Sequence, residues 1–336
     1  APILVAARPG RTKIPVPSIP PIPIAITAGN VKLLSNFFKI LFYIYKNTKY
    51  IFQLNLYPII AGNFMLDGGA MFGVVPKSIW QKTNPADNNN MVKIAARCLL
   101  IEDGDRVVLI DTGMGDKQSE KFFGYYYKWG EEPLESSLKK HGFHADDVTD
   151  VFLTHLHFDH CGGGVIRSGE SSFETTFKNA TYWSNKGHWD WAKDPNKRES
   201  ASFLKENILP IEESGQLHYL EKDGENYLTK SDLGFDVLFV DGHTEKQMIP
   251  IVSYKGQKIA FAADLVPTHG HVPLPYIPGY DIRPLISLKE KDLFLNYCAK
   301  NNVFLFFEHD AFVELGSLQK TDRGIRLNEK IYLKDL

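Results

Sequence analysis

Short apolar runs alternate with amphipathic stretches from about residue 53 onward. Apolar runs bounded by turn residues predict buried strands, and apolar positions spaced three and four apart predict helices that face the core. We expect strands at residues 92–101, 106–110, 151–154, 235–240, 248–254, 258–263 and 303–307. We expect helices at residues 133–141 and 289–300. This alternation predicts a layered α/β architecture.

The first fifty residues have a different pattern. Five prolines between Pro15 and Pro23 favour an extended conformation. The apolar stretch at 33–45 is interrupted by Lys39 and lacks a clean cleavage site, so it is neither a good secretory signal nor a membrane span. We therefore expect an extension at residues 1–50, with an amphipathic helix near 31–46, followed by one folded domain at residues 51–336.

The charge balance excludes several classes of partner. Lysine and arginine number 38 against 40 acidic residues, so the net charge of −2 predicts no binding to nucleic acid or to an acidic membrane surface. The three cysteines have no CxxC spacing, which favours reduced thiols. A cytoplasmic location is therefore favoured, while a secreted or periplasmic one stays open. The sequence is also compatible with a homodimer.

A dense group of potential metal ligands follows one of the expected strands. Residues 154–160 read Thr-His-Leu-His-Phe-Asp-His, which places His155, His157, Asp159 and His160 within six positions. Zinc is bound readily by imidazole nitrogen and carboxylate oxygen. In an extended backbone His155 and His157 point to the same side. The glycines at 162–164 allow close backbone approach or positive φ beneath such a site.

Three isolated residues occupy the same kind of position. His243, Asp264 and His309 each follow an apolar run that is expected to be a strand. Any one of them alone would be explained equally well as a buried core residue or a loop carboxylate. Because strand ends at one sheet edge commonly assemble ligand sites, their repeated placement predicts that they join the cluster. Seven ligands predict two zinc ions per chain.

In its motifs the sequence resembles the metallo-β-lactamase superfamily over about residues 53–320. The HxHxDH motif and the order of the later ligands carry the resemblance, together with Asp111 in Leu-Ile-Asp-Thr-Gly. The resemblance implies an αββα sandwich of two mixed sheets flanked by helices. It also implies that His155, His157 and His243 hold one metal, that Asp159, His160 and His309 hold the other, and that Asp264 bridges them. Asp111 is then expected to orient a ligand histidine.

Within the superfamily, the segment at 65–77 resembles lactonases that open N-acyl-homoserine lactones, the quorum-quenching enzymes. Phe158 inside the motif matches the same branch. The acyl chain needs an apolar slot, for which Met71, Phe72, Phe158 and Trp129 are the candidates. Core packing is the alternative explanation for Met71 and Phe72.

The resemblance implies that a metal-bridging hydroxide attacks the lactone carbonyl, while Asp159 carries the proton to the ring oxygen. Related lactonases place a Tyr three residues after the bridging Asp, where this chain has Pro267. We expect His269 or His271 to donate that hydrogen bond instead, although both are equally compatible with loop histidines of no catalytic role.

Other functions are compatible with the same ligands. An organophosphate triester hydrolase of the methyl-parathion type shares the ligand set, as does another ester or lactone hydrolase of this fold. A metal-stabilised interaction protein is less well supported, because no ligand of the set is missing. The sequence leaves the acyl-chain length, the native metal and the oligomeric state open.

Overall fold

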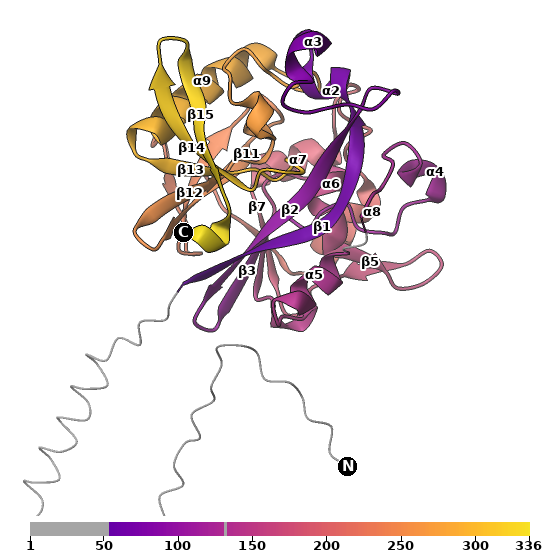
Figure 1. Cartoon of the computed structure of the whole chain (residues 1–336). Coiled ribbons are helices and arrows are strands. Elements are labelled where there is room, and N and C mark those ends of the chain that lie inside the picture. The colour runs from indigo at the N-terminus through magenta and orange to yellow at the C-terminus, as the bar shows by residue number, and fades with distance from the viewer. Residues whose placement is uncertain (1–53, 131–132) are drawn as a thin grey trace, which may run out of the picture. The chain divides into compact units, whose positions relative to one another are not determined.

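Two mixed β-sheets form the core of the structure (Figure 1). The computed structural model describes residues 54–130 and 133–336, so the expected extension and its helix lie outside the described residues. The first sheet has the strand order β1-β2-β3-β4-β7-β8, and the second has the order β15-β14-β13-β12-β11-β10-β9. The sheets pack on each other, as the rings of Phe152 and Phe235 show with centroids 5.3 Å apart.

The first sheet consists of β1 (Asn55–Asp67), β2 (Met91–Asp103), β3 (Arg106–Ile110), β4 (Asp150–Phe152), β7 (Thr181–Ser184) and β8 (Leu217–Tyr219). The second consists of β9 (Thr229–Lys230), β10 (Asp236–Val240), β11 (Gln247–Tyr254), β12 (Gln257–Phe261), β13 (Val303–Phe306), β14 (Leu315–Thr321) and β15 (Gly324–Ile331). A separate pair is formed by β5 (Val165–Arg167) and β6 (Phe173–Thr175).

The helices are α2 (Gly68–Phe72), α3 (Lys77–Trp80), α4 (Glu120–Phe123), α5 (Leu134–Lys140), α6 (Phe158–Cys161), α7 (Lys186–Lys193), α8 (Lys205–Glu213) and α9 (Pro284–Lys300). Helix α5 packs on β1, and α9 packs on β13, β14 and β15 through buried Phe294 and Leu295. The predicted αββα arrangement is confirmed. None of the helices in the described ranges combines the length and hydropathy that a membrane span requires.

The expected strands are present, and β3 has the predicted boundaries. Helix α9 begins earlier than predicted, at Pro284, because proline at the first helical position starts a helix without an apolar pattern. Leu285 in that first turn is 80% exposed, so the turn carries no core-facing signal. The sequence pattern predicts no element between residues 160 and 230 or after residue 310, where the structure has β5 to β9, α7, α8, β14 and β15.

Strand direction brings the candidate ligands together. Strands β3 and β4 are parallel, β12 and β13 are parallel, and β10 has the direction of β12 because both are antiparallel to β11. Asp111, His155, His243, Asp264 and His309 follow the carboxyl ends of these five strands. The fold therefore gathers them at one edge of the sandwich, where irregular backbone can bend toward a ligand.

Candidate metal centre

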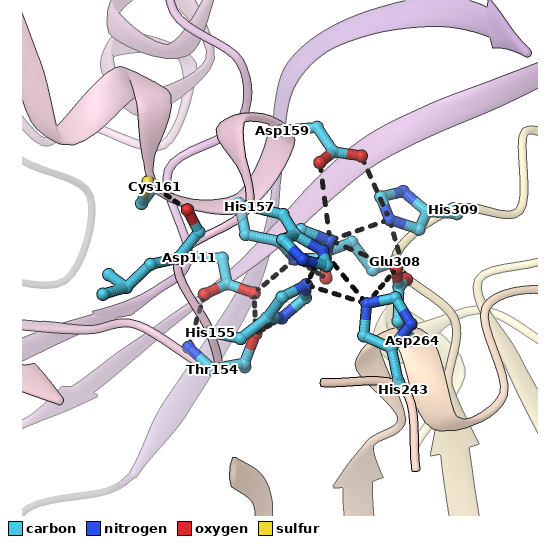
Figure 2. A network of polar contacts seen from close by, with 12 residues as sticks. Asp111, Thr154, His155, His157, Asp159, Cys161, His243, Asp264, Glu308 and His309 are labelled. Atoms are coloured by element: carbon cyan, nitrogen blue, oxygen red, sulfur yellow. Dashed lines mark hydrogen bonds and ion pairs between the residues drawn. The ribbon is translucent and has the colours of Figure 1, made fainter. Parts of the chain in front are cut away.

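Seven side chains converge at this edge of the sandwich (Figure 2). They form one group of His155, His157, His243 and Asp264 and a second group of Asp159, His160 and His309. The HxHxDH segment leaves β4, and its last residues enter the short helix α6. Asp159 has 16% of its side chain exposed, whereas the others are more deeply buried, so the centre opens on the side of Asp159.

In the first group three imidazole nitrogens face one another. Nε2 of His155 lies 3.1 Å from Nδ1 of His157. Nε2 of His243 lies 3.2 Å from Nε2 of His155 and 3.1 Å from Nδ1 of His157. Oδ2 of Asp264 completes the group at 3.2 Å from Nε2 of His243. A tetrahedral zinc ion with bonds of about 2.0–2.1 Å would separate its ligand atoms by roughly 3.4 Å. The donor set therefore fits one such ion.

The second group is formed around the other oxygen of Asp264. Nε2 of His160 and Nε2 of His309 lie 3.1 Å apart. Oδ1 of Asp264 lies 3.0 Å from Nε2 of His309. The carboxylate of Asp159 lies 3.7 Å from His309 and 3.9 Å from His160. Oδ1 of Asp264 is buried and accepts no hydrogen bond within the described residues. An orphaned buried carboxylate oxygen that faces an imidazole lone pair fits a second cation.

The ring nitrogens that point away from the centre have acceptor partners. Nδ1 of His160 lies 3.0 Å from Oδ2 of Asp111, Nδ1 of His243 lies 3.0 Å from Asp281, and Nδ1 of His309 lies 2.8 Å from the carbonyl oxygen of Ala95. Carboxylate and carbonyl oxygens only accept hydrogen bonds, so each of these nitrogens donates. In the neutral form of each ring, the opposite nitrogen is then an unprotonated lone pair directed into the centre.

His155 and His157 follow the same rule with different partners. Nδ1 of His155 lies 3.1 Å from Oγ1 of Thr154, whose hydroxyl donates to Asp111. Nε2 of His157 lies 3.0 Å from Oε1 of Glu199. Asp111 thus supports His160 directly and His155 through Thr154, which is the position that the sequence predicted for it.

Burial and the neighbouring charges act on these groups in different directions. Burial lowers the pKa values of His160, His243 and His309, but the nearby carboxylates outweigh burial and raise them above the ordinary value. Burial and the neighbouring imidazoles, His160 foremost, lower the pKa of His155 well below its ordinary value, which keeps it neutral. Burial raises the pKa of Asp264, but the imidazoles of His309 and His243 outweigh burial and hold it well below its ordinary value. Asp264 is therefore an anion between neutral or cationic rings.

The backbone around the centre is closely packed and strained. Asp111 and Ala263 have φ values of 58° and 40°, a left-handed conformation that is uncommon outside glycine and often marks functional sites. A Cβ on Gly163 would lie 2.1 Å from the carbonyl oxygen of Thr112, and one on Gly162 would lie 2.2 Å from that of Met114. The predicted close approach at the glycines is confirmed, but none of residues 162–164 has positive φ.

Sequence comparison agrees with this geometry. Residues 94–166 match the model of the metallo-beta-lactamase superfamily. The crystal structure of a probable metal-dependent hydrolase from Staphylococcus aureus has 26% sequence identity to the chain and superposes with a TM-score of 0.73, covering 83% of this chain and 99% of that one.

The chain is a hydrolase with the metallo-β-lactamase fold.

Two further matches in the superfamily are lactonases. An N-acyl homoserine lactonase from Bacillus cereus is 24% identical over 274 residues, which cover 78% of this chain and 95% of the relative. AidC, a dizinc quorum-quenching lactonase solved with a product, N-hexanoyl-L-homoserine, has 21% identity and a TM-score of 0.68, with 83% of this chain and 95% of AidC covered.

The structure does not support His271 as a donor to substrate. Its ring is fully buried, with Nδ1 2.8 Å from Oγ1 of Thr268 and Nε2 2.8 Å from the carbonyl oxygen of Met71. His269 is also engaged, because its Nδ1 contacts the carboxylate of Asp310 and its Nε2 lies 3.3 Å from Nζ of Lys330. The prediction for both is corrected: they connect loops behind the centre.

Met71 and Phe72 are likewise core residues. Both are fully buried, and the Phe72 ring is stacked between Trp80, at 4.9 Å, and His271, at 4.3 Å. Neither side chain faces open space, so the prediction that they contact substrate is corrected. The glycine-rich segment acts through packing, since a Cβ on Gly68 would lie 2.2 Å from the Trp80 ring.

The other two predicted pocket residues lie in different places. Phe158 borders the centre, where its ring contacts Phe122 at 5.2 Å and Tyr126 at 4.9 Å. Trp129 lines a cavity of about 490 Å³ that also includes Phe64, Met114 and Leu138, and none of the seven candidate ligands lines it. Phe64 links the two regions, because its ring lies 6.1 Å from those of Tyr126 and His309.

Four residues at the centre are not predicted by the sequence pattern. Glu308 is fully buried, and its Oε2 lies 3.1 Å from Nδ1 of His160. Glu199 and Asp281 support His157 and His243, and the ring of Tyr280 lies 5.4 Å from that of His243, edge to face. Burial raises the pKa of Tyr280 well above its ordinary value, with further contributions from Asp264 and Asp159. The Tyr280 hydroxyl is therefore protonated at neutral pH.

Proposed function

We propose that this chain binds two zinc ions and opens the lactone ring of N-acyl-homoserine lactones. The observation that carries the proposal is the pair of ligand groups that share the two oxygens of Asp264. It is supported by the similarity to an N-acyl homoserine lactonase from Bacillus cereus over most of both chains and by the fold shared with AidC.

Two zinc ions held by these residues would supply a nucleophilic hydroxide at neutral pH and polarise the substrate carbonyl. The outer partners of the ligand histidines prevent their imidazole rings from rotating. Ions held by these fixed ligands would therefore hold the lactone ring of the substrate in one position relative to Asp159 and Tyr280.

Asp159 is the residue proposed to move the proton. It lies on the open side of the centre, next to both histidines of the second group. When the bond between the carbonyl carbon and the ring oxygen breaks, the ring oxygen must gain a proton to leave as an alcohol. A carboxylate in contact with that oxygen can receive a proton from the attacking group and deliver it there. The products are a hydroxyl group and a carboxylate.

Tyr280 is placed to bind the carbonyl oxygen. Its protonated hydroxyl can donate a hydrogen bond to the oxygen that becomes negatively charged during attack. This assignment fills the role that Pro267 leaves open and that His269 and His271 are not positioned to fill.

The acyl chain is proposed to lie along the aromatic group of Phe122, Tyr126 and Phe158. Burial and then the negative charge of Asp159 raise the pKa of Tyr126 to about 12, so its hydroxyl stays protonated at neutral pH. Each methylene buried there contributes about 0.8 kcal/mol. Longer chains should therefore bind at least as well as short ones.

The test is kcat/KM of the zinc-loaded protein for homoserine lactones of graded chain length, measured beside an aryl phosphotriester and a penicillin. The proposal predicts that the lactones are the best substrates. A phosphotriester preferred by a wide margin would support the organophosphate alternative instead. Lactones that are inert at full zinc occupancy would overturn the proposal.

A further inference from the structure

The segment between α7 and α8 contacts the centre through two adjacent residues, Arg198 and Glu199. Glu199 is buried, and its two carboxylate oxygens receive four donors. Oε1 accepts from Nε2 of His157 at 3.0 Å and from the hydroxyl of Thr244. Oε2 accepts from Nε1 of Trp191 and Nδ2 of Asn196, each at 2.9 Å. A carboxylate offers about four acceptor positions, so Glu199 is held in one orientation.

This orientation decides which nitrogen His157 presents. Because Nε2 donates to Glu199, the lone pair of His157 is on Nδ1, and Nδ1 faces His155 and His243. The other four histidines of the centre present Nε2. His157 therefore depends on Glu199 for both its tautomer and its ring position.

Arg198 holds the second imidazole of the same group by a different route. Its Nη2 donates to the carbonyl oxygen of Gly279 at 2.7 Å and to that of Asp281 at 3.3 Å. Asp281 in turn holds Nδ1 of His243 at 3.0 Å. Two neighbouring residues thus set the positions of His157 and His243, which both belong to the first ligand group.

The second ligand group has separate supports. His160 is held by Asp111, and His309 is held by the carbonyl oxygen of Ala95 on β2. Asp111 follows β3 and Ala95 lies on β2, both in the first sheet, while Glu308, with Oε2 3.1 Å from Nδ1 of His160, follows β13 in the second sheet. Within the described residues, no hydrogen bond or ion pair joins Arg198 or Glu199 to His160 or His309.

We propose that Arg198 and Glu199 are positioning residues that set the zinc affinity of the first site independently of the second. The inference rests on the two-ion part of the proposed function and not on the substrate. It predicts that the two ions can be separated: weakening this segment releases one ion and leaves the other bound.

The test is a zinc titration of the full chain in competition with a chromophoric chelator. Glu199→Gln keeps the size of the side chain but turns an amide NH₂ toward the donors of Trp191 and Asn196. It should weaken one of the two sites by about 10- to 100-fold, the usual effect of losing an outer partner of a metal-binding histidine. The other site should stay within about twofold of wild type.

Arg198→Ala provides a second variant that does not disturb buried packing, because Arg198 is exposed. It should weaken the same site in the same direction by a smaller factor, even if Glu199→Gln fails to fold. Lys197→Ala and Glu213→Gln, exposed neighbours on the same part of the chain, are the matched controls and should bind zinc like wild type.

Equal weakening of both sites, or no weakening in either variant, would overturn the inference. A wild-type chain that binds fewer than two ions would instead contradict the proposed function, and this outcome is visible before any variant is made.

Discussion

Oδ1 of Asp264 lies 3.0 Å from Nε2 of His309, although its other oxygen belongs to the group that contains His155, His157 and His243. One carboxylate therefore connects two sets of imidazoles that come from different strands. Its negative charge offsets part of the charge of two closely spaced cations, which would otherwise repel each other.

Asp159→Asn should slow ring opening by about 100-fold or more, because the variant keeps the shape but cannot accept the proton. The measurement is kcat on a homoserine lactone, with zinc content determined on the same sample, since Asp159 also belongs to the second ligand group. Full zinc occupancy with an undiminished rate would exclude the proton-transfer role.

Tyr280→Phe should lower kcat by roughly 100-fold with little change in KM, because it removes one donor to the developing negative charge. Zinc content should be unchanged. Tyr276→Phe, four residues earlier in the chain, is the matched control and should retain the wild-type rate. Equal rates for the two variants would show that Tyr280 does not bind the carbonyl oxygen.

Phe72→Ala should act on stability and not on substrate selection. The ring is fully buried between Trp80 and His271, so its loss should reduce the free energy of unfolding by about 3–5 kcal/mol. Val74→Ala, at a side chain that is 98% exposed, should change it by less than about 0.5 kcal/mol. Urea denaturation checks both. A stable Phe72→Ala variant that selectively loses long-chain lactones would restore the original pocket assignment.

Lys291 predicts a specific pH dependence of stability. Its ammonium is buried and donates to the carbonyl oxygens of Pro273 and Tyr276, and burial lowers its pKa to about 7. Between about pH 7 and the ordinary lysine pKa near 10.4, the unfolded chain binds more protons than the folded chain. Raising the pH therefore stabilises the folded state, by up to about 1.4 kcal/mol per pH unit.

Lys291→Met removes this titration. Between pH 7 and pH 9, the unfolding free energy of wild type should rise relative to that of Lys291→Met, with saturating zinc present for both proteins. A difference that stays flat over this range would show that the lysine pKa is not lowered.

The parts of this protein that could be predicted from sequence are those encoded locally. Strand β3 follows from one apolar run between turn residues, and the HxHxDH motif lies directly after another. His243, Asp264 and His309 were placed with it because each ends an apolar strand, and parallel strand ends meet at one edge. The structure brings all seven residues together as this reasoning required.

The remaining parts depend on contacts between distant segments. Glu199 is 42 residues from His157, and Asp281 is 38 residues from His243, so no local pattern identifies either carboxylate as a partner. His271 is next to the ligand-rich region in sequence, yet stacking on Phe72 turns it into the core. Proximity in sequence therefore predicted a role that packing excludes.

The measurement that tests the central claim most directly is the zinc content of the purified full chain and of Asp264→Ala, determined by elemental analysis after expression in zinc-replete medium. The account predicts close to two zinc ions per wild-type chain and the loss of at least one in the variant, because Asp264 contributes an oxygen to each ligand group. One ion or none in wild type, or two ions retained without Asp264, would contradict the dinuclear centre.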